Sequence, residues 1–336
     1  MNFFIFLLLL PIFGSLYSHY YLYPVALLNH GKTILFIKQS CHNHIDVLLW
    51  NSETQQMNSC LWSLFNPAEI QVLPDESGFS FIDNGRLRIK YFNKRSPKTI
   101  DFDQYLYDIH NVHWINEHEC YLSAKAAYNY AAIFHCTIDG MVSGISCGET
   151  DDNYPQKVDD QLFYIQKTKD QNYYVAQTLF SGSGETEHIM AFENHPIVFL
   201  KMSSLEQGFV ISHEKTVKSN DERISFDYYR IKKEREGWTK KLLFSFYIPS
   251  YLLIKGNDLC LYESLLPLLP RHHGSLIYFV SSWSNSENKL EPFVFDMKRA
   301  KARKIKIQHK GGGQFYHIFV PFILNKVELV CGGNVL

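Results

Sequence analysis

Residues 73–91 read LPDESGFSFIDNGRLRIKY, and this stretch carries the clearest fold signal in the chain. Apolar and polar residues alternate on both sides of Asp83-Asn84-Gly85, which is the period of a strand with one buried face. Asn-Gly accepts positive φ at both central positions of a tight turn, as two-residue hairpins require. The stretch therefore predicts two antiparallel strands joined at Asn84-Gly85.

The residue pattern of the second strand predicts which side chains face the core and which face water. Leu87 and Ile89 alternate with Arg86, Arg88 and Lys90. Since successive side chains of a strand point to opposite faces, we expect the two apolar residues in the core and the three basic residues in water.

Similar runs recur along the whole chain, and no later segment holds an apolar stripe at helical spacing beyond about three turns. The sequence therefore predicts an all-β protein. The further predicted strands are 33–37, 46–50, 131–137, 162–166, 173–180, 197–202, 209–212, 224–231, 241–247, 276–282, 292–297 and 304–308.

Composition narrows the class of protein. The chain has 336 residues, of which 46% are hydrophobic and 20% charged, which is too apolar for a disordered protein. Its net charge of −1 gives no field that would recruit nucleic acid or an anionic membrane. Aromatic residues make up 15%, which favours pleated, half-buried surfaces.

Grouping the strands gives units of roughly forty to sixty residues with about three or four strands each. This pattern predicts a β-propeller of about six blades, with about seven as the alternative. We expect Phe315 to Val330 to pair with the first blade and so remove the open sheet edges. The predicted units are 22–64, 65–105, 106–150, 154–185, 186–248 and 256–310.

The segment Leu73 to Phe81 resembles the turn-and-strand signature of TolB-like and WD-repeat β-propellers. Looser versions stand at 114–123 and 158–165. The resemblance implies a six-bladed propeller that is exported from a bacterial cell and acts as an interaction platform. Its blade-turn residues here are Pro74, Asp75, Gly78, Asp83, Asn84 and Gly85.

The N-terminus predicts export. The apolar run from Phe3 to Phe13 is followed by Gly14, Ser15 and Ser18, and it is too short for a good membrane anchor. We therefore expect a signal peptide over 1–18, one propeller domain over 19–336, and a periplasmic or secreted protein. Because no Lys or Arg precedes the run, the alternative is an uncleaved leader at the membrane.

The cysteines form no dense framework. There are seven, an odd number that leaves at least one outside any intramolecular disulfide. We expect small, buried side chains in strands, although Cys120 and Cys136 could bridge neighbouring strands.

One motif is typical of hydrolases. Gly144-Ile145-Ser146-Cys147-Gly148 matches the nucleophile elbow, in which a strained strand-to-helix turn holds the serine. The residues that follow, Glu149 to Pro155, predict a polar loop between blades and no helix. We therefore interpret Ser146 as part of a glycine-rich turn.

Histidines gather at three places. His42 and His44 would share one face of an extended segment and could hold zinc with Cys41 or Asp46, but a polar hairpin tip is the favoured interpretation. His272 and His273 follow Pro270 and predict a turn with exposed rings. The third group is His110, His113 and His118.

Acidic turns occur at 149–152 and at Asp159-Asp160. They lack the spacing of a calcium loop, so we expect charged loops and neither a metal nor a cofactor. Asp75, Asp83 and Asp159 are candidate carboxylates for glycoside chemistry.

The densest run of positive charge in the sequence covers 298–306. Here we expect an outer strand that shows its lysines to water, which also blocks edge-to-edge aggregation. The residues of a candidate interaction surface are His272, His273, Lys298, Arg299, Lys301 and Arg303.

Together these patterns predict an exported, monomeric propeller that binds an unidentified protein partner, inserts in no membrane beyond its leader, binds no nucleic acid, and is not an enzyme. The alternative is a carbohydrate-active glycosidase or lyase that uses funnel carboxylates. Two or more carboxylates or histidines that converge in the central funnel would favour that alternative.

Overall fold

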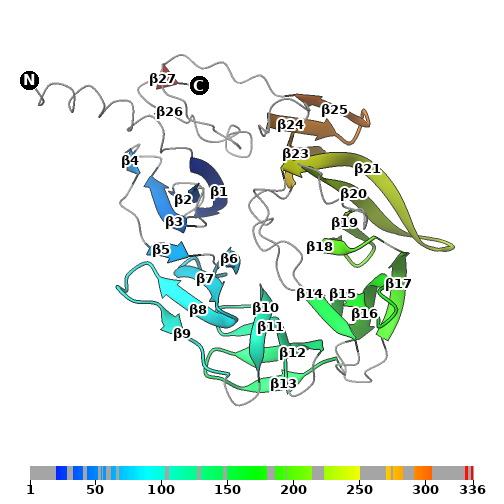
Figure 1. Cartoon of the computed structure of the whole chain (residues 1–336), viewed down its shortest axis with the longest axis horizontal. Coiled ribbons are helices and arrows are strands. Elements are labelled where there is room, and N and C mark those ends of the chain that lie inside the picture. The colour runs from blue at the N-terminus through cyan, green and yellow to red at the C-terminus, as the bar shows by residue number, and fades with distance from the viewer. Residues whose placement is uncertain are drawn as a thin grey trace, which may run out of the picture. The chain divides into compact units, whose positions relative to one another are not determined.

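The computed structural model gives the arrangement of most of the chain (Figure 1). The residues that the structure describes are 20–28, 33–40, 44–51, 54, 56–57, 62–65, 68–102, 106–126, 130–146, 150–179, 186–193, 195–213, 223–249, 270–273, 275–282, 291–304, 330–331 and 334–335. The predicted signal peptide and most of the predicted closing segment lie outside these residues.

The described residues form strands and turns and contain no helix, which confirms the all-β prediction. None of them therefore belongs to a helix that could cross a membrane. The chain divides into two compact units, one made of 1–66 with 309–336 and the other of 67–308.

The first unit contains a five-stranded antiparallel sheet in the order β1-β2-β3-β4, with β5 also paired to β3. Leu35 and Val47 are fully buried in it. A separate pair, β26 (Val330–Cys331) and β27 (Asn334–Val335), also belongs to this unit. The sheet strands are β1 (Tyr20–Leu28), β2 (Thr33–Ser40), β3 (His44–Asn51), β4 (Gln56–Met57) and β5 (Trp62–Phe65).

The second unit contains a succession of four-stranded antiparallel sheets, each built from four strands consecutive in the chain. In Figure 1 they follow one another from cyan to orange. Their strands are β6 (Ala68–Val72), β7 (Gly78–Asp83), β8 (Arg86–Tyr91), β9 (Lys98–Thr99); β10 (Tyr107–Trp114), β11 (Glu119–Lys125), β12 (Ala131–Thr137), β13 (Val142–Gly144); β14 (Asp151–Val158), β15 (Gln161–Lys167), β16 (Tyr173–Leu179), β17 (Thr186–Phe192); β18 (Ile197–Ser204), β19 (Gln207–His213), β20 (Arg223–Glu234), β21 (Gly237–Pro249); and β22 (Arg271–His273), β23 (Leu276–Ser281), β24 (Glu291–Asp296), β25 (Lys301–Lys304).

Four-stranded sheets of this kind are what a propeller requires, and they match the predicted units except at one boundary. β17 belongs to the sheet of β14–β16, whereas the predicted unit 186–248 includes it, because its exposed residues at 186–188 hide the apolar alternation. The exact number of blades and the closure by 315–330 stay predictions.

Two segments predicted as loops are strands. β14 covers Asp151 to Val158, where polar residues suggested a loop. Its Asp152 and Asn153 are buried because hydrogen bonds satisfy their side chains. β22 covers His272 and His273, which had been expected in a turn.

The hairpin at 78–91 is confirmed. Asn84 and Gly85 have φ of 51° and 71°, and Asp83 pairs with Arg86 across the turn. Leu87 and Ile89 are fully buried as predicted.

Lys90 departs from the prediction that the basic residues of this hairpin face water. Its side chain is buried instead of solvated. Its Nζ donates to the carbonyl oxygens of Tyr91 and Lys94, and burial lowers its pKa.

The three stretches that resemble a propeller signature occupy equivalent places. Residues 73–77 join β6 to β7, residues 115–118 join β10 to β11, and Asp159-Asp160 join β14 to β15. Each is thus the turn between the first and second strands of its sheet. Asp75 organises the first turn, because its carboxylate accepts hydrogen bonds from the N–H and hydroxyl of Ser77.

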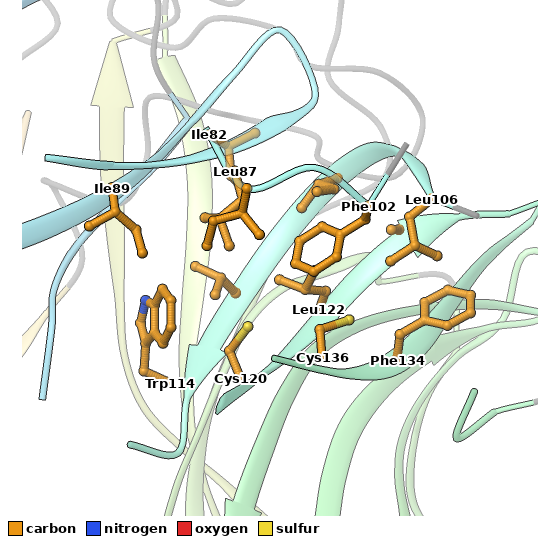
Figure 2. Close-up of a cluster of buried hydrophobic side chains, with 14 of the residues drawn as sticks. Ile82, Leu87, Ile89, Phe102, Leu106, Trp114, Cys120, Leu122, Phe134 and Cys136 are labelled. Atoms are coloured by element: carbon orange, nitrogen blue, oxygen red, sulfur yellow. The ribbon is translucent and has the colours of Figure 1, made fainter. Parts of the chain in front are cut away.

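Facing sheets bury their apolar side chains against each other. Between β6–β9 and β10–β13 the core includes Leu87, Trp114 and Leu122 (Figure 2). Trp114 Nε1 donates to Ser80 Oγ at 2.8 Å across this interface. Cys120 and Cys136 also lie in this core as free thiols, directly opposite each other on β11 and β12. No disulfide joins them in this structure.

Gly78 stands where the backbone of β8 approaches closely. A Cβ at this position would lie 2.4 Å from the carbonyl oxygen of Lys90, and backbone cannot yield as a flexible side chain would. Gly78→Ala should therefore lower the free energy of unfolding by about 1 to 3 kcal/mol. Gly144→Ala is the matched control, because its nearest neighbour would be a side-chain atom at 4.0 Å. Urea denaturation of both variants checks this, and equal stabilities would contradict it.

Candidate functional site

Side chains of three first strands, β6, β10 and β14, bind the backbone of the next first strand. Glu69 on β6 accepts a hydrogen bond from the N–H of Val112 on β10 at 2.6 Å. Gln71, also on β6, donates to the carbonyl of the same Val112 at 2.8 Å. These two bonds join two sheets whose described strands do not pair with each other.

The same arrangement repeats along the chain. Asn111 on β10 accepts from the N–H of Tyr154 on β14 at 3.2 Å. Gln156 on β14 then donates to Leu200 O at 2.6 Å and accepts from Met202 N at 2.7 Å, both on β18. We call Glu69, Gln71, Asn111 and Gln156 the clasp residues.

Irregular backbone accompanies the clasps. Glu69, Asp108 and Tyr154 have φ of 50°, 54° and 53°, which is unusual for residues other than glycine. In each case the register of the first strand shifts nearby. Such β-bulges re-aim side chains and are frequent next to functional sites.

The bulge in β10 presents an exposed group of polar side chains. Lys125 Nζ lies 2.9 Å from Asp108 Oδ2, and the two side chains are 24% and 34% exposed. Tyr107 pairs with Lys125 across β10 and β11 and is 49% exposed. We call Tyr107, Asp108 and Lys125 the β10 surface group.

A buried histidine lies behind this group. His110 Nε2 is 3.5 Å from Asp108 Oδ2, and its side chain is only 4% exposed. Within the described part of the chain this nitrogen has no hydrogen-bond partner. Burial lowers the pKa of His110 to about 4, so the imidazole is neutral at pH 7. His113, on the same strand, has its pKa lowered to about 4 by the same cause.

The next sheet holds a second buried carboxyl. Asp152 is 1% exposed and accepts hydrogen bonds from Thr150 and Gln166 at 2.9 and 3.0 Å. Burial raises its pKa to about 6, although hydrogen bonds, among them one from Ser146, oppose the shift. The carboxyl thus lies within a hydrogen-bonded interior.

Ser146 follows the short edge strand β13. Its Oγ accepts a hydrogen bond from Ile133 N–H at 2.9 Å. This contact fits the predicted turn and not a strand-to-helix elbow.

The histidine groups separate in the structure. His110 and His113 stay together on β10, whereas His118 lies in the turn after it, with a side chain that is 69% exposed. His42 lies outside the described residues. The described residues include no group of three or more His, Cys, Asp or Glu placed to hold a metal ion.

The predicted acidic candidates do not converge. Asp75 lies in the turn before β7, Asp83 at the end of β7 pairs with Arg88 at 3.1 Å, and Asp159 lies in the turn after β14. The predicted basic residues lie together instead. Lys298 and Arg299 form the turn before β25, and Lys301 and Arg303 belong to β25, all of them exposed.

Sequence reasoning missed the β10 surface group. Tyr107 to Trp114 mixes polar and apolar residues without the period of a strand, because the bulge interrupts it. The cluster of histidines at 110 and 113 was the available signal for this strand.

No protein-family model matches the chain, and no curated protein matches it. Solved structures do resemble it. Oligogalacturonate lyase from Vibrio parahaemolyticus is 14% identical over 86% of this chain and 77% of that one, with a TM-score of 0.52. A puromycin-hydrolyzing peptidase from Mycobacterium tuberculosis is 10% identical over 85% of this chain and 53% of that one, with a TM-score of 0.50. A TolB structure from Agrobacterium tumefaciens is 13% identical over 61% of this chain and 90% of that one, with a TM-score of 0.35.

The likeness to the lyase and the peptidase agrees with the predicted β-propeller architecture, and at these identities it concerns the fold alone. They correct one expectation. The chain was predicted not to be an enzyme, yet the lyase and the peptidase share its fold. This fold therefore gives no ground for excluding catalysis.

The buried carboxyl of Glu69 predicts a pH dependence. Burial raises its pKa from 4.5 to about 8 despite the hydrogen bonds from Val112, Gln71 and Asn111. The folded protein therefore keeps a proton that the unfolded chain releases, and the free energy of unfolding falls as pH rises from 4.5 to 8. Glu69→Gln cannot titrate but can still accept from Val112.

We expect the stability of Glu69→Gln relative to wild type to rise between pH 5 and pH 8. Urea denaturation of both proteins across this range measures the difference. Parallel pH profiles would contradict the buried, protonated carboxyl. The lowered pKa values of His110 and His113 act in the opposite direction, because they remove stability as pH falls from 6.5 to about 4. Both proteins contain these histidines, so their effect cancels in the comparison.

Proposed function

We propose that this chain is a β-propeller that binds another protein through the surface around the start of β10. The observation that supports this most is the β10 surface group, in which an exposed tyrosine adjoins a half-buried Asp108–Lys125 pair. Tyrosine is enriched among the residues that carry binding energy in protein interfaces, and polar or charged groups commonly surround such a residue at the rim.

The support beneath this surface is rigid. The Ile109 N–H donates to Gly85 O at 3.0 Å, which ties the bulge of β10 to the turn of the preceding hairpin. A Cβ at Gly85 would lie 3.0 Å from Asp108 Cα. His110 fills the space behind the Asp108 carboxylate. A surface held this way loses little conformational entropy on binding.

A photo-crosslinking residue in place of Tyr107 tests the proposal in the native cell. We expect one discrete protein adduct at this position, strongly reduced by Lys125→Glu. Met141, which is 69% exposed just before β13, is the control position and should give no such adduct. Equal adducts at both positions, or none at 107, would contradict the proposal.

A second candidate is an enzyme that acts on a carboxylated carbohydrate. It is favoured by the approach of His110 to Asp108 within 3.5 Å on a first strand, and oligogalacturonate lyase shares the fold. Lys125 would neutralise a substrate carboxylate. Formation of unsaturated products from oligogalacturonate, followed by absorbance and lost in Lys125→Met, would support it. No turnover, or turnover that Lys125→Met leaves unchanged, would count against it.

We also propose that the protein is exported, on the basis of the apolar run from Phe3 to Phe13 and the small residues after it. N-terminal sequencing of the mature chain should give a start after Ser15 or Ser18. A retained Met1 would refute this part of the proposal.

A further inference from the structure

Two neighbouring hairpins of the second unit are each rich in basic side chains. β20 and β21 form the longer one, with 12 and 13 residues, and its tip extends away from its sheet in Figure 1. β24 and β25 form the other. Residues 232–241 and 296–304 together hold ten basic and three acidic side chains, in a chain whose net charge is −1.

Stacked aromatic rings hold these two hairpins together. Phe244 of β21 lies 4.2 Å from Phe279 of β23 and 5.1 Å from Phe295 of β24, measured between ring centroids. Phe279 in turn stacks on Phe293 at 5.5 Å. These contacts place β21 beside β23 and β24, whereas Lys240, nearer the tip of the longer hairpin, donates to Ala191 O on β17 of the preceding sheet.

The basic side chains of both hairpins are exposed. Lys233, Arg235, Lys241, Lys301 and Arg303 all face solvent. Among the described residues, the ion pair formed in the turn between β24 and β25 joins Arg299 to Asp296 at 3.6 Å. We call residues 298–303 the basic edge.

The strand at this edge can accept another strand. β25 is the last strand of its sheet and, within the described residues, pairs with β24 alone. Basic residues on such an edge repel a second copy of the same strand. They attract a strand of opposite charge, whose backbone can add to the sheet.

We propose that the basic edge binds an acidic polypeptide segment that adds to β25 in extended form. Charge complementarity supplies the attraction, and the backbone edge supplies direction. Other polyanions fit less well. Leu242, 47% exposed, offers too little apolar area for a membrane, and the charged strand lacks interleaved aromatic rings for nucleic-acid bases.

This inference deepens the proposed role in protein binding by giving the chemistry of a partner at a second surface. It concerns other strands than the β10 surface group. A test on the purified full chain with a synthetic peptide therefore fails independently of the crosslinking at Tyr107.

The test measures the fluorescence anisotropy of a labelled peptide of about ten glutamates. We expect binding that weakens steeply with salt, because the attraction between exposed charges is screened. Lys301→Glu/Arg303→Glu should weaken it at least about tenfold. The matched control is Lys94→Glu/Arg95→Glu, which reverses two exposed charges in the turn after β8 and should change it less than about twofold.

A peptide with N-methylated alternate residues separates strand addition from plain charge attraction. It keeps every carboxylate but loses backbone donors, so it should bind more weakly. Equal binding of both peptides would overturn strand addition. Tighter binding of polygalacturonate, phosphatidylserine vesicles or single-stranded DNA, or no binding of the glutamate peptide, would overturn the acidic polypeptide as occupant.

Discussion

Among the described residues of the second unit, strands of neighbouring sheets do not pair, so something other than a β-ladder must fix one sheet against the next. The clasp residues provide this link, since an amide or carboxyl side chain of one first strand bonds to the backbone of the following one. Apolar burial between sheets is large but has no direction. Hydrogen bonds to backbone atoms at a defined position set the register between sheets, and Gln156 does so with both ends of its amide.

The candidate site depends on this linkage. The first strands bulge near the clasps, and the bulge at Asp108 moves its carboxylate toward Lys125 and away from the buried core. A neutral His110 can lie behind that carboxylate at little electrostatic cost, because its pKa is lowered by burial. The same first strands thus join the sheets and expose the charged group that we propose as a binding surface.

Much of the architecture was predictable from local signals. Asn84-Gly85 specified a turn whose positive φ values the structure contains, and period-two runs located most strands. The first strands were harder, because β14 buries Asp152 and Asn153 and β10 interrupts its own alternation with a bulge. Burial of Lys90 was hidden too, since its charge is satisfied by nearby carbonyls. Polar residues that are buried through long-range hydrogen bonds cannot be distinguished from loop residues in one sequence.

Hydrogen exchange at the amide of Met202 tests the clasps most directly. This N–H donates to Gln156 Oε1 from the neighbouring sheet at 2.7 Å. In Gln156→Ala we expect its exchange to accelerate markedly, while the amide of Val210, inside the ladder of the same sheet, keeps its protection. Unchanged exchange at Met202 would show that burial alone holds the sheets together and would contradict this account.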